Sequence, residues 1–239
     1  MATGTDKGGT WTTIAGTKGI VTTPAVNDLP VAVVGMSGWV SGDDANYSDN
    51  NAGGGGTYTK LGTATIPLSQ GGGTACALWF FVRNALITSA TSTTFSAAIT
   101  GDTGGGQTLL TFQGMTRTGA SAIKQSIGEN TQSENPPTIT FGATTLTTNP
   151  VILAVMGEIN PPALTPPTGF TEAEDTGYAT PTTGIWIAWD DSGNAATLFS
   201  TTGGALIDHN DIGIELDASA AASGSLIYKP GMNDALLAR

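Results

Sequence analysis

The sequence is poor in positive charge. Among its 239 residues, Lys and Arg together number 8 while Asp and Glu number 19, which gives a formal net charge of −11. The basic residues stand singly along the chain and form no cluster. A nucleic-acid binder needs clustered basic side chains to displace counterions from phosphates, and anionic membranes attract basic segments for a similar reason. The sequence therefore predicts that neither nucleic acid nor a membrane is a partner.

Cysteine and long apolar runs are also scarce. Cys76 is the only cysteine, so no disulfide can form within the chain, and its place beside the apolar run Ala77–Val82 predicts a buried, inert thiol. The sequence has no run of roughly 18 apolar residues, so it predicts no membrane-spanning helix. Met1–Thr10 has no apolar stretch, which predicts that the chain carries no signal peptide and is made in a cytoplasm.

Residues of the common catalytic sites are few. His209 is the only histidine, and a serine hydrolase needs a histidine base beside a nucleophile and an orienting acid. The polar segment Asp208–Asp211 favours a surface turn for this histidine, and no nucleophile elbow is present. Ser121–Lys124 matches the Ser-x-x-Lys pattern of penicillin-recognising enzymes, but the companion motifs are absent, so we attribute the match to chance.

Two acidic loops raise the alternative of a calcium site, because hard cations need clustered oxygen ligands. Neither loop has the spacing of an EF-hand, and turns rich in Asp and Asn are common without a metal. The glycine runs lack the Gly-Lys-Ser/Thr ending of a phosphate-binding loop. We therefore expect no cofactor and no bound metal. The loop residues are Asp43, Asp44 and Asp49 in the first loop and Asp190, Asp191 and Asn194 in the second.

Paired carboxylates would indicate glycoside hydrolysis, which uses two of them on either side of a sugar bond. Glu158 ends an apolar strand, and Glu172 and Glu174 lie near the edge of another. Carboxylates at strand ends are more often solvated termini than members of a catalytic pair. We keep sugar hydrolysis as a minor alternative and expect that the chain is not an enzyme.

A sugar-binding surface would need exposed aromatic rings. Trp79 and Trp186 lie inside apolar runs and are predicted to belong to the core. Trp39 lies beside the long acidic loop, where its ring could serve as a platform for a sugar. The residues of this possible ligand-facing loop are Trp39, Asp43, Asp44 and Tyr47.

Glycine and threonine replace the usual charged residues. Gly numbers 34, and charged residues make up only 11% of the chain. Threonine is β-branched and suits a half-exposed strand, while glycine supplies the turns between strands. The composition therefore predicts an all-β protein.

The sequence contains a degenerate internal repeat of strand-like segments. Pro30–Met36 recurs as Pro150–Met156, and Leu78–Val82 recurs as Ile185–Trp189, with loops that are shorter in the second copy. Self-similarity on this scale indicates one structural unit used twice. The repeated parts are apolar strands, so the repeat describes a scaffold and not a site.

The strands are of two kinds. Leu78–Val82 and Val151–Val155 are apolar on consecutive positions, which predicts that both of their faces are buried. Asp211–Asp217 alternates strictly between polar and apolar residues, which predicts that one of its faces is wet.

We expect a two-sheet antiparallel β-sandwich built from two pseudo-repeated halves, each giving strands to both sheets. The domain spans residues 19–230, and the pseudo-repeats cover about 28–115 and 138–217. Residues 1–18 are expected to form a polar N-terminal arm, and residues 231–239 a C-terminal tail. Apolar residues of the arm and tail are the predicted partner contacts: Trp11, Leu236 and Leu237.

The order of the elements resembles the jelly-roll-like β-sandwich domains of tailed-phage virion proteins and of some bacterial surface proteins. Three segments carry the likeness: Thr148–Gly157, Leu109–Met115 and Pro166–Glu172, the last of which is similar to a Pro-Pro-x-Gly-Trp-Thr turn. Phe170 stands where that family usually has Trp. The likeness covers roughly residues 20–228. The family has no shared catalytic residues to carry over.

The resemblance implies a virion component assembled in the host cytoplasm. We expect a non-enzymatic head decoration, cement or head-fibre protein that forms homo-oligomers. Its expected partners are other virion proteins, either the major capsid protein or tail proteins. The alternative is a tail or baseplate protein that binds a receptor or glycan. The acidic charge favours the head surface, because an acidic exterior protein does not hold packaged nucleic acid.

Overall fold

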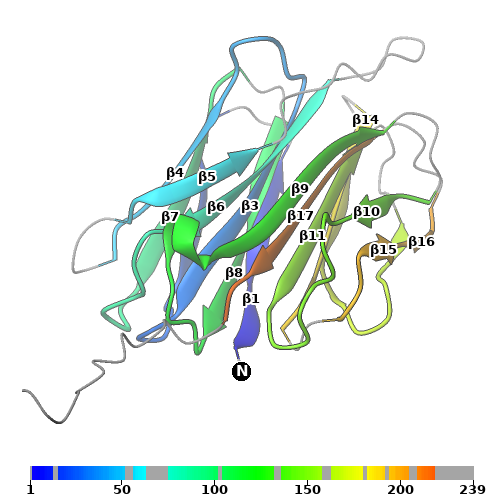
Figure 1. Ribbon diagram of the computed structural model, residues 1–239. Coiled ribbons are helices and arrows are strands. Elements are labelled where there is room, and N and C mark those ends of the chain that lie inside the picture. Colours follow the sequence, from blue (N-terminus) through cyan, green and yellow to red (C-terminus); the bar gives the residue numbers. More distant parts are fainter. Residues whose placement is uncertain are drawn as a thin grey trace, which may run out of the picture.

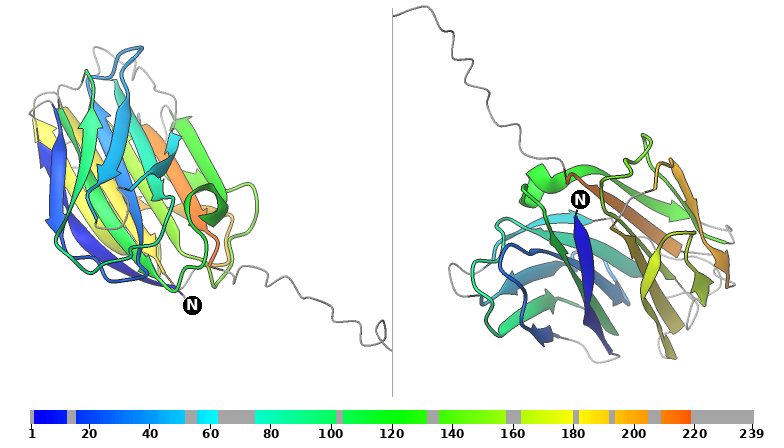
Figure 2. Two further views of the ribbon diagram at one scale, coloured as in Figure 1. Left: turned by 90° about the vertical axis from the view of Figure 1, so that its left-hand side faces the viewer. Right: turned by 90° about the horizontal axis from the view of Figure 1, so that it is seen from below.

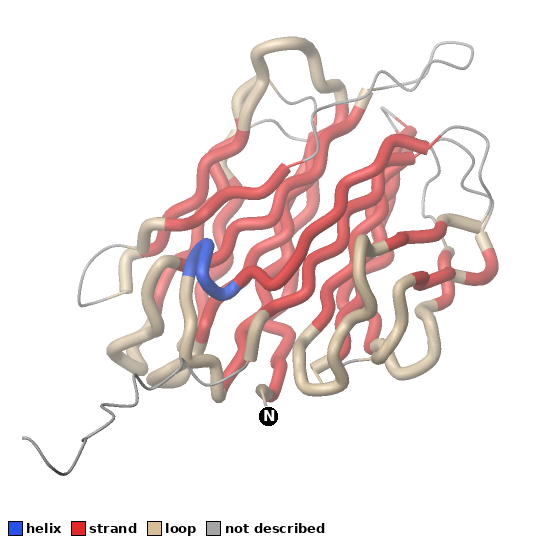
Figure 3. Tube along the Cα trace, in the orientation of Figure 1, coloured by secondary structure: helices blue, strands red, loops and turns tan. Residues whose placement is uncertain are grey.

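Strands dominate the chain, which Figure 1 shows as a computed structural model. The structure describes residues 2–12, 16–51, 56–62, 75–101, 104–131, 136–157, 163–179, 182–191, 194–204 and 209–218. Their only helical element is the short 3-10 turn η1 (Figure 3). The strands of the first half are β1 (Thr3–Thr12), β2 (Lys18–Thr22), β3 (Leu29–Ser37), β4 (Ala45–Asp49), β5 (Tyr58–Gly62), β6 (Cys76–Arg83), β7 (Thr93–Ile99) and β8 (Gly104–Gln113). After η1 (Gly119–Ala122) come β9 (Ile123–Thr131), β10 (Thr138–Thr140), β11 (Val151–Gly157), β12 (Leu164–Thr165), β13 (Thr171–Ala179), β14 (Thr182–Asp190), β15 (Leu198–Ser200), β16 (Thr202–Gly203) and β17 (His209–Leu216).

The strands pair antiparallel in two large sheets and three small ones. The first large sheet has the order β1-β8-β3-β6-β5, and the second has the order β13-β14-β11-β17-β9. A three-stranded sheet, β2-β7-β4, packs on the outer face of the first large sheet. The pairs β10-β15 and β12-β16 lie on the outer side of the second. The predicted all-β antiparallel sandwich is confirmed.

The core lies in three apolar layers. The first core cluster fills the space between the two large sheets and includes Phe80, Phe112 and Ile214. Two further clusters separate each large sheet from its outer layer, one around Phe95 and one around Trp186. Strands of the large sheets therefore pack apolar residues on both faces, which explains why β6 and β11 are apolar on consecutive positions, as the sequence predicts.

Each large sheet comes from one half of the chain. Seen from below, the strands of the first half lie on one side of the molecule and those of the second half on the other (Figure 2). Listed from its β9 edge, the second large sheet has the order β9-β17-β11-β14-β13. Each strand in this order occupies the same relative position along the chain of its half as the corresponding strand of β1-β8-β3-β6-β5. The expectation that each half gives strands to both sheets is therefore wrong. The strands of each half pair with one another, and the two large sheets pack face to face across the first core cluster.

The alternating strand near the C-terminal end was expected to have a wet face, and this expectation is wrong. All residues of β17 are buried, including Asp211 and Glu215. One face of β17 packs in the first core cluster through Ile212 and Ile214. The other face is covered by the outer layer, where Ile139 and Phe141 lie against Gly213. The alternation marks a strand correctly, but it does not reveal that a further layer covers the polar side.

The expected N-terminal arm is largely a sheet strand. β1 pairs with β8 along its length, apart from a register shift between Asp6 and Gly9. Ala2 is 2% exposed, and the Trp11 ring packs against the first core cluster. The physical reason is that β8 would otherwise expose a row of unpaired backbone groups at the edge of the sheet. Threonine-rich sequence of this kind forms such an edge strand readily.

The predicted last strand, Ser225–Tyr228, and the tail with Leu236 and Leu237 lie outside the described residues. Across the part of the chain that the structure describes, no helix has the length and apolarity needed to cross a membrane.

Candidate functional site

The predicted ligand-facing loop begins at the turn after β3. Trp39 is half-buried against the second core cluster, and its Nε1 donates to the backbone oxygen of Asp43 at 3.3 Å. The carboxylate of Asp43 accepts the backbone N–H of Val40 at 2.8 Å. These two bonds close the turn on itself, so Trp39 and Asp43 hold each other in place.

Asp44 pairs with a cation that the sequence analysis did not single out. Its carboxylate accepts a hydrogen bond from the ammonium of Lys60 on the edge strand β5. The Lys60 Nζ lies 5.5 Å from the ring centroid of Trp79 and 6.0 Å from that of Phe81. The bridge therefore joins β5, at the edge of the first large sheet, to the residue that precedes β4, at the edge of the three-stranded sheet. The position of the ammonium near the Trp79 and Phe81 rings favours cation–π attraction.

Tyr47 does not face a ligand, and its place in the predicted loop is wrong. It lies on β4, where buried and exposed residues alternate, and it is 8% exposed. Its hydroxyl donates to Oε1 of Gln107, whose Nε2 donates to the backbone oxygens of Lys18 at 2.7 Å and Phe95 at 2.9 Å. Burial, and next the negative charge of Asp49, raise the pKa of Tyr47 well above its ordinary value. Tyr47 is a core residue with a satisfied hydroxyl.

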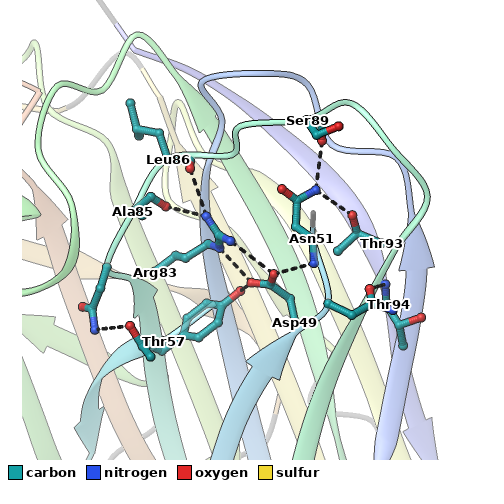
Figure 4. Close-up of polar contacts among 12 residues, drawn as sticks. Asp49, Asn51, Thr57, Arg83, Ala85, Leu86, Ser89, Thr93 and Thr94 are labelled. Carbon is teal, nitrogen blue, oxygen red and sulfur yellow. Dashed lines mark hydrogen bonds and ion pairs between the residues drawn. The ribbon is translucent and has the colours of Figure 1, made fainter. Parts of the chain in front are cut away.

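A buried ion pair lies where β4 and β6 end (Figure 4). Arg83 Nε donates to Asp49 Oδ2 at 2.7 Å, and Nη2 donates to Oδ1 at 3.2 Å. The two side chains are 3% and 0% exposed. The remaining guanidinium donor, Nη1, reaches the backbone oxygens of Ala85 at 2.9 Å and Leu86 at 3.0 Å. The hydroxyl of Tyr58 also donates to Asp49 Oδ2, at 2.6 Å.

The same carboxylate fixes the loops around it (Figure 4). The backbone N–H of Asn51 donates to Asp49 Oδ1 at 3.0 Å. The Asn51 side-chain Nδ2 then donates to the backbone oxygen of Ser89 and to Thr93 Oγ1, both at 2.9 Å. Gly56 passes so close that a Cβ there would overlap the Asp49 carboxylate. We call these side chains, Asp49, Asn51, Tyr58 and Arg83, the loop clamp.

The loop clamp is suited to holding structure and not to proton transfer. Burial acts to raise the pKa of Asp49, but hydrogen bonds from Arg83, Tyr58 and the Asn51 backbone outweigh it and hold the pKa below its ordinary value. Burial is also the main cause that raises the pKa of Tyr58 well above its ordinary value. At neutral pH the cluster therefore contains a carboxylate, a guanidinium and a neutral phenol, each with a partner. No member is poised to exchange a proton.

His209 is a buried strand residue, so its prediction as a turn histidine is wrong. It is 0% exposed, and its Nε2 lies 3.1 Å from Oδ2 of Asp211, which is 1% exposed. The polar segment continues as a strand because β17 pairs with β11 as far as His209 and Gly157. Tertiary pairing thus overrides the turn-like composition.

Cys76 is buried, as the sequence predicts. It lies at the start of β6, in the first core cluster between the large sheets. Asn210 Nδ2 donates to the Cys76 backbone oxygen at 2.9 Å and to its Sγ at 3.1 Å. The thiol therefore helps to join one half of the chain to the other.

The carboxylates considered for sugar hydrolysis do not face each other. A register shift between Glu172 and Glu174 places Glu172 opposite Ala188 and Glu174 opposite Ile187, on opposite faces of β13. Glu172 accepts the indole N–H of Trp186 at 3.2 Å on the outer side. Glu174 is turned toward the first large sheet, where Thr108 Oγ1 donates to it at 3.5 Å. Glu158 lies outside the described residues.

A raised pKa marks the outer side of β13. Burial, the nearby Asp175 and Glu174 raise the pKa of Glu172, although the hydrogen bond from Trp186 lowers it. Burial raises the pKa of Asp175 as well. The register places Asp175 opposite Trp186, on the same face as Glu172. The negative charges of these carboxylates act on one another at the sheet edge and favour the protonated form of Glu172.

Trp11, a predicted partner contact, packs within its own chain. Its Nε1 donates to Thr108 Oγ1 at 3.0 Å. The ring lies against Gly35, where a Cβ would come within 3.1 Å of it. The ring remains half-buried, so a role in contacting a partner stays a prediction.

Asp190 and Asn194 of the second acidic loop are hydrogen-bonded within the second half of the chain. Asn194 Nδ2 donates to Asp190 Oδ2 at 2.7 Å and to the backbone oxygen of Thr168 at 3.2 Å. Within the described ranges, no three or more His, Cys, Asp or Glu side chains are placed to hold a metal ion. The expectation of no cofactor stays a prediction.

Sequence reasoning missed Arg83, Tyr58, Gln107 and Lys60. The available signal was Arg83 itself, because an arginine that directly follows the apolar run Leu78–Val82 must end up buried or at a strand end. The partner of Arg83 is far along the chain, so spacing could not reveal it.

The fold and the polar clusters define the class of protein as an antiparallel β-sandwich whose buried polar groups fix strands and loops. Glu215, for example, accepts the Asn149 side-chain N–H at 2.7 Å and the Leu146 backbone N–H at 2.9 Å. Comparisons with protein-family models, with curated proteins and with solved structures find no match to this chain.

Proposed function

We propose that the chain is a non-enzymatic structural protein of a phage particle, displayed on the head surface as a decoration, cement or head-fibre protein. The observation that carries the proposal is that corresponding strands follow the same order in the two large sheets. The orders are β1-β8-β3-β6-β5 and β9-β17-β11-β14-β13. An order in which the first strand lies beside the last supports a jelly-roll interpretation of each half. Jelly rolls are a recurrent architecture of viral capsid proteins.

The polar clusters and the charge support the same proposal. The loop clamp and the Glu215 contacts hold strands and loops in place, which suits a rigid building block. A net charge of −11 favours an exterior position, because packaged nucleic acid repels an acidic surface. The proposed partners are the major capsid protein and further copies of the same chain, assembled in the host cytoplasm.

Purified particles of the phage that encodes the chain provide the test. Heads and tails are separated, and the copy number of the chain in each fraction is measured by quantitative mass spectrometry against the major capsid protein and a tail protein. The proposal predicts many copies per head and none in purified tails. A chain absent from the particle, or present only in tails, would overturn it.

A tail or baseplate protein that binds a receptor or glycan is the second candidate. The observation that favours it is the half-buried Trp39 ring beside Asp43 and the exposed Asp44–Lys60 bridge. A glycan array probed with the native chain and with Trp39→Ala tests this candidate. Binding that Trp39→Ala abolishes would support it, while an array that stays blank with the folded, native chain would count against it.

A further inference from the structure

The edge strands of the large sheets differ in how they resist pairing with another strand. β1 has a register shift between Asp6 and Gly9, and Gly8 within it has a φ of 89°. β13 has a register shift between Glu172 and Glu174 and carries several carboxylates. β5 is only 5 residues long. Bulges, charges and short length are the usual protections of sheet edges.

β9 is less protected than these strands, because its only charges are one lysine and one glutamate and its register shift is confined to one end. It is 9 residues long, and its only register shift against β17 lies at its first residues, between Glu215 and Leu216 of the partner strand. It lies at the edge of the second large sheet and runs across the front of the molecule (Figure 1). Among the described residues, the β9 backbone from Lys124 onward pairs with β17 alone. Its outer edge is therefore a template for a further strand.

The charges of β9 permit pairing with a second copy of the same strand. Its charged residues are Lys124 and Glu129, which have opposite signs in a chain whose net charge is −11. Two β9 strands that pair antiparallel about a two-fold axis keep the same sheet faces together. With Ile127 at the axis, Ile127 meets Ile127, Ser126 meets Gly128, and no like charges lie directly opposite each other.

We propose that β9 is the edge at which two copies of this chain associate, with the β9 strands antiparallel about Ile127 and the second large sheets joined into one continuous sheet. The choice of a second copy as occupant rests on the proposed function, in which the chain is present in many copies. The interface is isologous, because the same edge is used on both subunits.

A charge swap tests the interface. Ser126 and Gly128 are exposed, and Gly128 does not have a positive φ, so both accept a charged side chain in the monomer. In the proposed dimer, Ser126→Glu with Gly128→Glu places like charges opposite each other, and Ser126→Lys with Gly128→Lys does the same. Light scattering should show a dimer for the native chain, with a dissociation constant roughly tenfold higher or more for each double variant.

An equal mixture of the two double variants should restore the dimer, because opposite charges then face each other. Asn46→Glu with Ser48→Glu is the matched control, since both residues are exposed on the edge strand β4 and the dimer should survive. A native chain that is monomeric, or a dimer that persists in both β9 double variants, would overturn the proposal.

A cysteine scan gives an independent reading of the register. Directly opposed residues of antiparallel strands have Cα atoms about 4.5–5.5 Å apart, which suits a disulfide. Ile127→Cys should therefore form a disulfide-linked dimer under mild oxidation, while Ser126→Cys should not, and Cys76 is buried in both. A Ser126→Cys chain that cross-links as fast as Ile127→Cys would contradict the register. Loss of this dimer and absence from the virion are separate results, so the two proposals fail separately.

Discussion

At the scale of the residue, the most demanding feature is the ion pair of Asp49 and Arg83. Both side chains are almost fully buried. The Nε and Nη2 groups of Arg83 donate to the Asp49 carboxylate, and Nη1 donates to two backbone carbonyl oxygens. Such a pair adds little net stability compared with apolar residues, but removing one partner leaves the other charge buried. Its role is to fix the loops that follow β4 and β6, through the Asn51 N–H and the carbonyl oxygens of Ala85 and Leu86.

Replacing Arg83 by Met should therefore destabilise the chain by about 3–5 kcal/mol, because the Asp49 carboxylate stays buried without its cation. Urea-induced unfolding of both proteins measures the difference. Lys60→Met is the matched control, since it removes the exposed bridge to Asp44 and should cost about 1 kcal/mol or less. Equal effects of the two substitutions would contradict the structural role of the loop clamp.

Glu172 gives a pH-dependent prediction. Burial is the main cause that raises its pKa in the folded chain, so the folded state holds this proton more tightly than the unfolded state. The associated stability is present below the ordinary pKa of glutamate, about 4.3, and is lost as pH rises through the folded value. Glu172→Gln should thus unfold at a higher temperature than the native chain at pH 7, and the gain should vanish near pH 3. A gain of the same size at both pH values would contradict the assignment.

Burial of individual residues was partly predictable. Trp79, Trp186 and Cys76 were placed in the core correctly, because each lies in or beside an apolar run. Tyr47 and His209 were not, because each lies among polar neighbours and is buried by strands distant in sequence. Gln107, which accepts the Tyr47 hydroxyl, is also distant in sequence and could not be recognised as its partner.

At the scale of the element, β1 of the first large sheet contacts the second large sheet near the end of β14. Gly4 lies against the ring of Trp189, which packs edge-on against Phe112 with ring centroids 6.1 Å apart. The backbone N–H of Gly4 also donates to Asp191 Oδ2 at 3.0 Å. A strand of the first half is thereby fixed to the end of a strand of the second.

Gly4→Ala should destabilise the chain by about 1–3 kcal/mol, because the added Cβ overlaps the Trp189 ring, which must move. Thermal unfolding followed by tryptophan fluorescence reads both the stability and the displacement of the ring. Gly142→Ala is the control, since its Cβ would meet nothing within 4 Å. A Gly4→Ala chain as stable as the control would show that β1 does not pack in this way.

Elements with a strong apolar pattern were predicted best. β3, β6, β11 and β14 correspond to the repeated apolar segments in the sequence. β1 was missed because threonine and glycine gave no apolar period in that segment, and its partner, β8, lies about a hundred residues away. Pairing with a distant strand leaves no local trace in a polar sequence.

At the scale of the whole molecule, the two halves share the first core cluster. Phe80 of the first half and Ile214 of the second both belong to it. The halves should therefore unfold together, and Phe80→Ala should lower the stability of both by about 3–5 kcal/mol. Hydrogen exchange of amides in β7 and in β15, which lie in opposite outer layers, measures each half separately. Protection lost in β7 but kept in β15 would contradict a shared core.

A similarity between the outer layers of the two halves bears on the proposed role. Ile20 pairs with Phe95 in the outer layer of the first half, and Ile139 pairs with Phe199 in that of the second. Both pairs are buried against the large sheet beneath them. The likeness extends through the layers, which supports the view that the chain is a scaffold used twice.

The position of the chain in the native particle tests the central claim most directly. A cryo-electron microscopy reconstruction of the phage that encodes it should show density for this sandwich at repeated positions on the outer surface of the head. The β9 edges of neighbouring copies should meet where two copies adjoin. Density confined to the tail or baseplate, or no density for the chain in the particle, would contradict a head-surface structural role.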